Sequence, residues 1–361
     1  MEQSNNFVVI LAGGIGSRFW PESRQDLPKQ FLDILGTGYS LIQATFHRVK
    51  AICPTQNIFV VTHESYKHLI QEHLPELPVE NIVAEPFRKN TAPAAAYISY
   101  KIFAQNPNAN IAICPSDHLI LYEASFVSTI QKGLEYAAAH PVIITLGIQP
   151  TRPDTGYGYI QYNTQEEDNK IHKVITFTEK PNLDLARTFL KSGDFLWNSG
   201  MFIWNVNTFI QEFKRFLPEM AEVFDKALKF FNTKDEAELI AHIYSQCSNV
   251  SIDYGIMEKV TNAYIIPSNF GWSDLGTWES AYEHAHKDNH GNAINCKQAL
   301  VIDANNNYIK AQKEKLVVLQ GLDDFIIVDT DKVLLICERR NEQEIKEFVA
   351  EIKRKYGETY L

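Results

Sequence analysis

The chain has 361 residues, which suits one large domain with a smaller one, and its 45% hydrophobic and 22% charged residues are ordinary for a globular protein. The net charge of −10, with no basic block, argues against a general nucleic-acid surface. No apolar run reaches the roughly 18 residues that a membrane-spanning helix needs, so we expect no membrane partner.

Cysteine usage and the N-terminus predict the compartment. The cysteines are scattered, odd in number and form no C-x-x-C pair; they are Cys53, Cys114, Cys247, Cys296 and Cys337. This pattern fits reduced thiols rather than a disulfide framework. The N-terminus lacks the basic region and long apolar core of a signal peptide. We therefore expect a cytoplasmic location.

The most informative stretch is residues 7–32, which read FVVILAGGIGSRFWPESRQDLPKQFL. Its first five residues form the short apolar run expected of a strand buried on both faces. Gly13, Gly14 and Gly16 follow directly. Because glycine has no Cβ and tolerates positive φ, such a loop can turn its backbone N–H groups toward an anion. Glycines needed only for a tight turn would look the same.

Two cations accompany this glycine loop. Arg18 has a planar fork that fits phosphate oxygens, and Lys29 offers a point charge for a second phosphate. The dinucleotide-binding fingerprint fails, because Phe19 occupies the place of its third small residue. The P-loop also fails, because no Gly-Lys-Ser/Thr run is present. A strand, a glycine loop and two cations predict a triphosphate-binding site of another kind.

Strand-like and helix-like patterns alternate through the first part of the chain. Strands are expected at residues 57–62, 82–84, 111–114 and 142–146. Helices are expected at residues 41–51, 66–74, 91–104 and 126–139. This alternation predicts a mostly parallel α/β sheet with covered faces. Ligands collect at the carboxyl ends of such strands, so Glu85-Pro86 and the Pro115-Ser116-Asp117-His118 run should share one rim with the glycine loop.

The pattern changes beyond Tyr157. Alternating runs at residues 157–162 and 174–178 predict antiparallel strands. Residues 208–243 read as helical, with a second helix beginning at Pro218.

The composition turns polar near residues 288–295, and we place a domain boundary there. The runs ALVIDA, YIKA, KLVVL, FIIVD and KVLLICE then predict a compact all-β module, closed by a charged helix at residues 342–355. Short repeated strands permit a β-helix. We therefore predict domains of residues 1–288 and 289–361.

Two aspartates are candidate ligands for Mg²⁺, which prefers one or two carboxylates together with substrate phosphates. Asp117 ends a strand in PSDH, and Asp274 lies between small residues in GWSDLG. A helix-capping role for Asp117 and a turn-forming role for Asp274 are the alternatives.

Three further motifs carry polar side chains suited to a sugar phosphate. Glu179 and Lys180 end a strand in FTEKP, where a surface ion pair is the alternative. Asn198 in WNSGMFIW has an amide suited to hydroxyl groups, although a turn asparagine would look the same. Gly158 in TGYGYI permits close backbone approach or simply a hairpin. Asn90 and Thr91 resemble a helix cap.

The wording of LAGGIGSRFWP, PKQFL, EPFRKNTAPA and FTEKP resembles the sugar-nucleotide pyrophosphorylase family, specifically its branch that uses GTP and mannose 1-phosphate. The resemblance covers about residues 7–290 and, more loosely, the C-terminal part. It implies an α/β fold with a Rossmann-like, GT-A-like mixed sheet and a small all-β module that is a left-handed β-helix.

The implied reaction converts GTP and α-D-mannose 1-phosphate into GDP-mannose and pyrophosphate, with Mg²⁺ as cofactor. We also expect a homodimer. Two alternatives stay open, namely another nucleotide and sugar 1-phosphate pair on the same fold, and a catalytically silent subunit that binds a sugar nucleotide.

The resemblance also assigns roles to single residues. The implied catalytic residues are Arg18, Lys29, Asp117, Lys180 and Asp274, of which Asp117 and Asp274 hold the metal. The implied nucleotide-binding residues are Leu11, Ala12, Gly13, Gly14, Gly16, Arg18, Lys29, Glu85, Asn90, Thr91 and Ser116. The implied sugar-phosphate-binding residues are Gly158, Glu179, Lys180, Asn198, Asp253 and Lys259.

Overall fold

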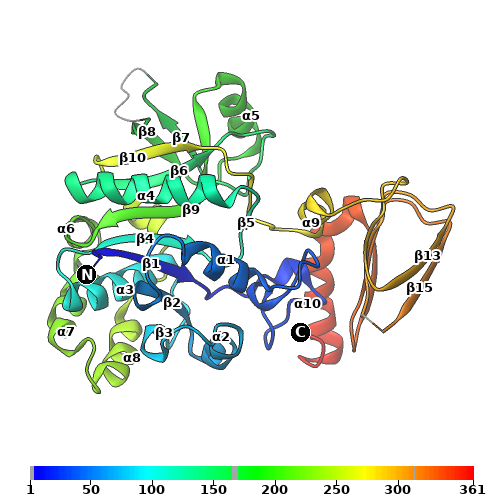
Figure 1. Ribbon diagram of the computed structural model, residues 1–361, viewed down its shortest axis with the longest axis horizontal. Helices are drawn as coiled ribbons and strands as arrows, with labels where there is room; N and C mark the ends of the chain where they lie inside the picture. The colour runs from blue at the N-terminus through cyan, green and yellow to red at the C-terminus, as the bar shows by residue number, and fades with distance from the viewer. Residues whose placement is uncertain (1–3, 165–169, 313) are drawn as a thin grey trace. The chain divides into compact units, whose positions relative to one another are not determined.

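The computed structural model describes residues 4–164, 170–312 and 314–361 (Figure 1). The chain divides into two compact units. The first unit comprises Met1–Gly13, Thr45–Ser116 and Ile120–Trp272. The second unit comprises Gly14–Ala44, Asp117–Leu119 and Ser273–Leu361. The predicted boundary between residues 288 and 289 stays a prediction.

The first unit contains a nine-stranded mixed sheet with the order β3-β2-β1-β4-β9-β6-β10-β8-β7. Its strands are β1 (Asn6–Leu11), β2 (Ile58–His63), β3 (Ile82–Glu85), β4 (Asn110–Pro115), β6 (Ile143–Ile148), β7 (Tyr159–Tyr162), β8 (His172–Thr178), β9 (Phe195–Asn205) and β10 (Ala263–Ser268). The β3-β2-β1-β4 half is parallel, whereas β9 runs antiparallel to β4, β6 and β7. The predicted mixed α/β sheet is therefore confirmed.

Helices cover this sheet. The helices of the chain are α1 (Leu41–Val49), α2 (Lys67–His73), α3 (Thr91–Gln105), α4 (Glu123–Ala139), α5 (Leu183–Ser192), α6 (Val206–Phe216), α7 (Pro218–Ala227), α8 (Glu236–Gln246), α9 (Trp278–His284) and α10 (Ile345–Tyr356). α4 packs on β4, β9 and β10, and α3 packs on α6 and α7. In the described ranges, none of the helices has both the length and the apolar character needed to span a bilayer.

The apolar run of β1 explains its central place in the sheet. Val8, Val9 and Ile10 are all fully buried, because β1 has a parallel neighbour on each side and helices on both faces. The parallel strands β3, β1 and β4 end at Glu85, Leu11 and Pro115, at one edge of the sheet. The predicted shared rim of first-unit residues is confirmed.

The C-terminal part of the second unit is built from short strands in two sheets (Figure 1). One sheet has the order β12-β14-β16-β17, and the other pairs β13 with β15. The strands are β12 (Ala293–Asn295), β13 (Gln298–Ile302), β14 (Tyr308–Lys310), β15 (Leu316–Gln320), β16 (Phe325–Asp329) and β17 (Leu334–Glu338). Strands two apart in sequence pair in parallel, as successive turns of a β-helix do. Outside this C-terminal part, the short strands β5 (Leu119–Ile120) and β11 (Trp272–Ser273) pair with each other in a separate sheet.

Aromatic packing holds the segment after the glycine loop within the second unit. The ring centroids of Phe19 and Trp278 are 4.8 Å apart, and both side chains are fully buried. Trp278 Nε1 donates to the backbone carbonyl of Trp20 at 3.1 Å, and Tyr308 also packs against Trp278. The loop that carries Arg18 and Lys29 is thus anchored on residues more than two hundred positions away.

Candidate active site

Three residues predicted to act on phosphates and metal meet in the second unit. Lys29 Nζ lies 2.9 Å from Asp117 Oδ2 and donates to the backbone carbonyl of Asp274 at 2.8 Å. Burial disfavours the charged form of Asp117, but the Lys29 ammonium and other neighbours more than offset this and lower the pKa of that carboxyl. The Lys29 ammonium group thus joins the Asp117 carboxylate to the backbone of Asp274, and a metal ion shared by the two carboxylates stays a prediction.

The glycine loop places Lys29 through direct contact. Gly16 has φ of +71°, and a Cβ added there would lie 2.4 Å from Lys29 Cβ, so any larger residue would displace the lysine. The Lys29 backbone N–H donates to the Ile15 carbonyl, and the Gln30 amide donates to the Gly14 carbonyl at 3.0 Å. Sequence reasoning missed Gln30, although it lies within the PKQFL run. Arg18 follows Gly16 by two positions, and its side chain is exposed.

A tight turn orients Asp274. Leu275 has φ of +44° although it is a buried leucine, a conformation that costs free energy and persists only where the surroundings enforce it. The Gly276 N–H donates to Asp274 Oδ1 at 3.1 Å. A Cβ on Gly276 would lie 2.6 Å from Asp274 Oδ2, so a larger residue there would displace the carboxylate. The turn-forming role weighed for Asp274 is therefore real and aims its carboxylate.

Several predicted nucleotide-binding residues meet at the rim of the first unit. The Ser116 N–H donates to the Leu11 carbonyl at 3.0 Å, and the Thr62 hydroxyl donates to the Ala12 carbonyl at 2.9 Å. A Cβ on Gly13 would lie 3.3 Å from Glu85 Oε2. Because of this spacing, the glycine lets the Glu85 carboxyl approach the backbone where β1 ends.

Glu85 is buried and is bonded to a residue that the sequence did not single out. The Tyr244 hydroxyl donates to Glu85 Oε1 at 3.0 Å. Burial raises the pKa of Glu85 to about 7, and the bond from Tyr244 offsets only part of this shift. Tyr244 belongs to α8, outside every recognisable motif, so no sequence signal identified it.

Asn90 and Thr91 begin α3 as the predicted cap. Asn90 Oδ1 accepts from the Thr91 N–H at 2.9 Å, with Asn90 at φ of +69°. The Thr91 hydroxyl accepts from the Ile252 N–H at 2.9 Å and ties the helix start to a neighbouring segment. The capping role is confirmed, and a contact with the nucleotide stays a prediction.

Most of the predicted sugar-phosphate residues form a second cluster in the first unit. Asn198 Nδ2 donates to Asp253 Oδ1 at 2.9 Å, and Lys180 forms an ion pair with Glu179. A Cβ on Gly158 would lie 2.5 Å from Glu179 Oε2 and 3.3 Å from Asn198 Cβ. The glycine therefore leaves the space in which these side chains meet.

The charges of this cluster are unevenly exposed. The Glu179 side chain is 6% exposed, whereas that of Lys180 is 57% exposed and available to an anion. Burial, and then the neighbouring Glu179 charge, raise the pKa of Asp253 to about 6. Lys180 has φ of +45°, an unusual conformation for a lysine that recurs at functional sites.

One residue without a predicted role contacts this cluster, and one predicted residue does not. Glu258, which was not assigned a role, accepts from the Glu179 backbone N–H at 3.1 Å. Lys259 is exposed, and the contacts within the described ranges do not join its side chain to the cluster. Asp253 begins a single π-helical turn, Asp253–Met257, which places its carboxylate toward Asn198 while the chain continues away.

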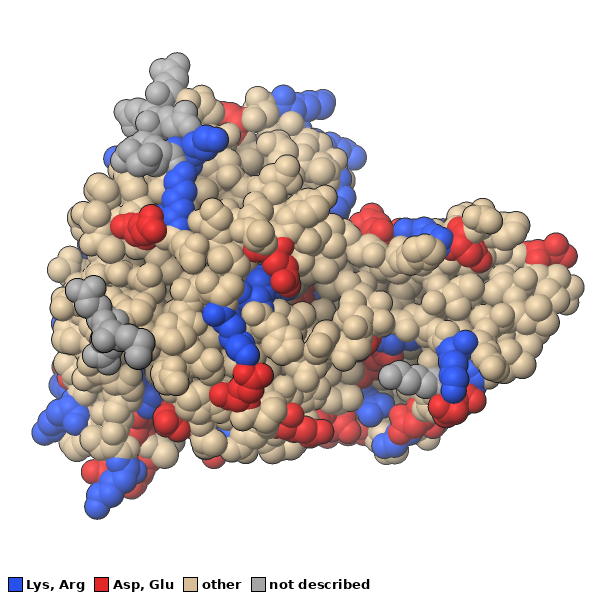
Figure 2. Space-filling view, in the orientation of Figure 1, with Lys and Arg blue, Asp and Glu red and all other residues tan. Residues whose placement is uncertain are grey.

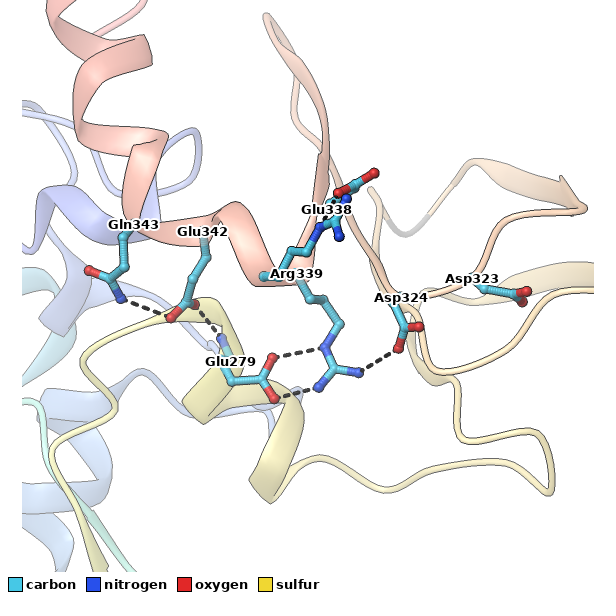
Figure 3. Close-up of a pocket in the computed structure, with 8 residues that line it drawn as sticks. Glu279, Asp323, Asp324, Glu338, Arg339, Glu342 and Gln343 are labelled. Carbon is cyan, nitrogen blue, oxygen red and sulfur yellow. Dashed lines mark hydrogen bonds and ion pairs between the residues drawn. The ribbon is translucent and has the colours of Figure 1, made fainter. Parts of the chain in front are cut away.

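A pocket of about 570 Å³ lies among the C-terminal residues of the second unit (Figure 3). Arg339 crosses it to the carboxylate of Glu279, and Glu342 accepts from the Glu279 backbone N–H at 2.8 Å. None of the predicted site residues lines this pocket. The assignment of the predicted residues to an active site stays a prediction.

Comparison with models of known protein families shows which family the chain belongs to. The family model described as Nucleotidyl transferase matches residues 7–291. The chain belongs to the nucleotidyl transferase family. A second model, described as MannoseP isomerase/GMP-like beta-helix domain, matches residues 297–352 and agrees with the paired parallel strands. The predicted family, the enzyme class and the β-helix-like C-terminal part are confirmed.

Individual proteins are similar to this chain over most of its length. A mannose-1-phosphate guanylyltransferase of Salmonella montevideo is 36% identical, covering 96% of this chain and 73% of that protein. One of Escherichia coli K12 is 34% identical, covering 98% and 74%. A solved structure from Thermus thermophilus, described as a mannose-1-phosphate geranyltransferase, is 25% identical with a TM-score of 0.87, covering 97% and 100%. The roles of single residues stay predictions.

Proposed function

We propose that the protein transfers GMP from GTP to α-D-mannose 1-phosphate, giving GDP-mannose and pyrophosphate. The observation that carries this proposal is the meeting of Lys29, Asp117 and Asp274 around one ammonium group. It occurs in a nucleotidyl transferase whose relatives at 34–36% identity are named mannose-1-phosphate guanylyltransferase. Both proposed substrates are small molecules, as expected for a nucleotidyl transferase.

The reaction needs no covalent enzyme intermediate. An oxygen of the sugar phosphate attacks the α-phosphorus of GTP in line. The bond from that phosphorus to the bridging oxygen of pyrophosphate breaks, and its electron pair leaves with pyrophosphate. Such transfers depend mainly on positioning and on neutralising phosphate charge. Arg18 and Lys29 would bind phosphate oxygens of GTP, and Lys180 would hold the attacking sugar phosphate.

The donor set suits Mg²⁺. Asp117 and Asp274 supply two carboxylates, and this hard cation usually takes one or two of these with phosphate oxygens and water. Within residues 4–164, 170–312 and 314–361, no group of three or more His, Cys, Asp or Glu side chains could hold a metal ion without substrate. We propose that Asp117 and Asp274 hold Mg²⁺ with the nucleotide. When bound, the ion would neutralise negative charge on the phosphates.

A substrate panel tests the proposal. GTP, UTP, dTTP and ATP are each combined with mannose 1-phosphate and with glucose 1-phosphate, and pyrophosphate release is measured. We expect the highest kcat/KM with GTP and mannose 1-phosphate, and Lys29→Met serves as the matched control with lowered activity. Equal or greater activity with UTP and glucose 1-phosphate would replace the substrate assignment. No release from any pair, with GDP-mannose still bound, would identify a regulatory subunit.

A cytoplasmic location is also a proposal. The five cysteines are free, and four of them are buried. Burial raises the pKa of the Cys53 and Cys114 thiols to about 12, so these groups stay protonated and unreactive. Unpaired thiols of this kind suit a reducing compartment.

A further inference from the structure

The glycine loop presents successive backbone N–H groups that the protein itself leaves available. Within residues 4–164, 170–312 and 314–361, the N–H groups of Ile15 and Gly16 donate to no protein acceptor. Both residues are partly exposed, so a ligand can reach these groups. Gly16 has the left-handed backbone conformation, which in a turn helps to bring successive N–H groups around a concave site for an anion.

The two carbonyl groups next to these N–H groups are held by buried polar side chains. The Gly14 carbonyl accepts from Gln30 Nε2 at 3.0 Å. The Ile15 carbonyl accepts from Ser23 Oγ at 2.6 Å and from the Lys29 backbone N–H at 3.2 Å. Gln30 and Ser23 are each only 2% exposed, so both carbonyls point toward the interior of the second unit.

The geometry of the peptide bond links these carbonyls to the N–H groups. In a planar trans peptide, the carbonyl of one residue and the N–H of the next point in opposite directions. The bond from Gln30 to the Gly14 carbonyl therefore turns the Ile15 N–H away from the interior. In the same way, the bond from Ser23 to the Ile15 carbonyl turns the Gly16 N–H away from the interior.

A polyphosphate needs local donors on this protein. The chain has a net charge of −10, and on the face seen in Figure 2 the lysines and arginines are scattered among acidic residues. Backbone N–H groups that are already oriented can bind an anion without the free-energy cost of ordering long side chains. The residues that orient these groups should therefore affect how tightly a polyphosphate binds.

We propose that Gln30 and Ser23 are positioning residues for the triphosphate of the nucleotide. They hold the loop rather than the substrate, and they keep the N–H groups of Ile15 and Gly16 directed at phosphate oxygens. This inference rests on the proposed use of a nucleoside triphosphate.

The two bonds also predict an order of effects. Within the described residues, Gln30 is the one donor to the Gly14 carbonyl, whereas the Ile15 carbonyl keeps the Lys29 N–H when the Ser23 hydroxyl is lost. Loss of the Gln30 amide should therefore disturb the loop more than loss of the Ser23 hydroxyl.

Binding of inorganic tripolyphosphate tests the proposal, because this probe has neither a base nor a sugar. Its affinity for the full chain is measured by titration calorimetry. The dissociation constant should rise roughly tenfold in Gln30→Leu and about threefold in Ser23→Ala. In steady-state kinetics, KM for GTP should rise by similar factors, while kcat and KM for mannose 1-phosphate stay within about twofold of the wild-type values.

Gln43→Leu is the matched control. Gln43 lies in the same segment of the second unit, and its Oε1 accepts from the Ser40 N–H at 2.9 Å at the start of α1. This variant should keep the wild-type affinity for tripolyphosphate. Thermal melts verify folding. If Gln30→Leu melts early, Ser23→Thr is compared with Ser23→Ala, because threonine keeps the hydroxyl and should restore the lost affinity.

The proposed function and this inference fail in different ways. If another nucleotide proves to be the substrate, tripolyphosphate affinity should still fall in Gln30→Leu, which would support the positioning role. Wild-type affinity for tripolyphosphate in a folded Gln30→Leu variant would overturn that role even if GTP and mannose 1-phosphate are the substrates. Equal rises in KM for both substrates would also overturn it, because they would indicate general structural damage.

Discussion

Lys29 and Asp117 form a close ion pair, with 2.9 Å between the ammonium nitrogen and one carboxylate oxygen. The lysine side chain is only 5% exposed, whereas the aspartate side chain is 32% exposed. The cation expected to bind the triphosphate is therefore held by a carboxylate expected to bind the metal. Because each neutralises the other, changing either residue should disturb both functions.

The two predicted phosphate-binding lysines should differ in the substrate that they affect. Lys29→Met should lower kcat/KM for GTP by tenfold or more, because a lost charge-assisted contact typically costs about 1–3 kcal/mol. Lys180→Met should mainly lower kcat/KM for the sugar phosphate. Initial rates with each substrate varied in turn measure both effects, and thermal melts control for folding. Identical losses toward both substrates in both variants would show that this division is wrong.

The predicted metal site can be tested by a double-mutant cycle. Asp117→Asn and Asp274→Asn keep side-chain shape but remove charge, so each should raise the Mg²⁺ concentration needed for half-maximal turnover. If both carboxylates bind one ion, the double variant should be little worse than the poorer single variant. Turnover is measured against Mg²⁺ for all four proteins. Strictly additive losses, or a single variant with normal turnover at low Mg²⁺, would argue against a shared ion.

The sequence was most informative where a local pattern determines structure. The apolar run of β1, the cap at Asn90 and the glycine at position 16 were all identified, because strand burial, capping and close backbone approach depend on residue type. The shared rim followed from the parallel order of strands. These features need no knowledge of distant contacts.

Contacts between distant segments were not predictable in this way. Tyr244 bonds to Glu85, which lies 159 positions away in the sequence. No sequence motif links these two residues. The positive φ of Leu275 contradicts the intrinsic preference of a leucine, and no local pattern indicates it. The bond between Asp253 and Asn198, 55 positions apart, likewise joins two separate motifs, and the role of Lys259 stays a prediction.

Glu85 should make stability depend on pH. Its pKa is raised from 4.5 to about 7 in the folded chain, so the folded state binds a proton more tightly than the unfolded state. Stability should therefore fall as pH rises from about 4.5 to about 7, by up to about 3 kcal/mol. Glu85→Gln keeps an acceptor for Tyr244 but cannot ionise, so it should lack this loss.

Denaturant unfolding of both proteins from pH 4.5 to pH 8 measures the effect. The free energy of unfolding of Glu85→Gln minus that of the wild type should increase up to about pH 7. Above that pH the difference should stay constant. Tyr244→Phe is a useful companion, because it removes the bond that partly offsets burial, so the loss of stability should continue to a higher pH. A constant difference across the range would mean that Glu85 ionises normally in the folded chain.

A buried ion pair should contribute to the stability of the second unit. Lys310 Nζ lies 2.7 Å from Glu22 Oε2 and donates to the Asp33 carbonyl at 2.7 Å, and both charged side chains are less than a fifth exposed. Burial raises the pKa of Glu22, and the Lys310 charge opposes that rise. Lys310→Met leaves a buried carboxyl without its partner, which typically costs about 3–5 kcal/mol.

The Glu22→Gln/Lys310→Met double variant should recover much of that loss, because it removes both charges together. Lys353→Met, which breaks the exposed Lys353 and Glu358 pair, should barely change stability and serves as the control. Denaturant unfolding at pH 7 and at pH 5 separates the contributions. Lys310→Met should be less destabilising at pH 5, since Glu22 then takes up a proton. Equal destabilisation at both pH values, with no recovery in the double variant, would mean that Lys310 acts through packing rather than charge.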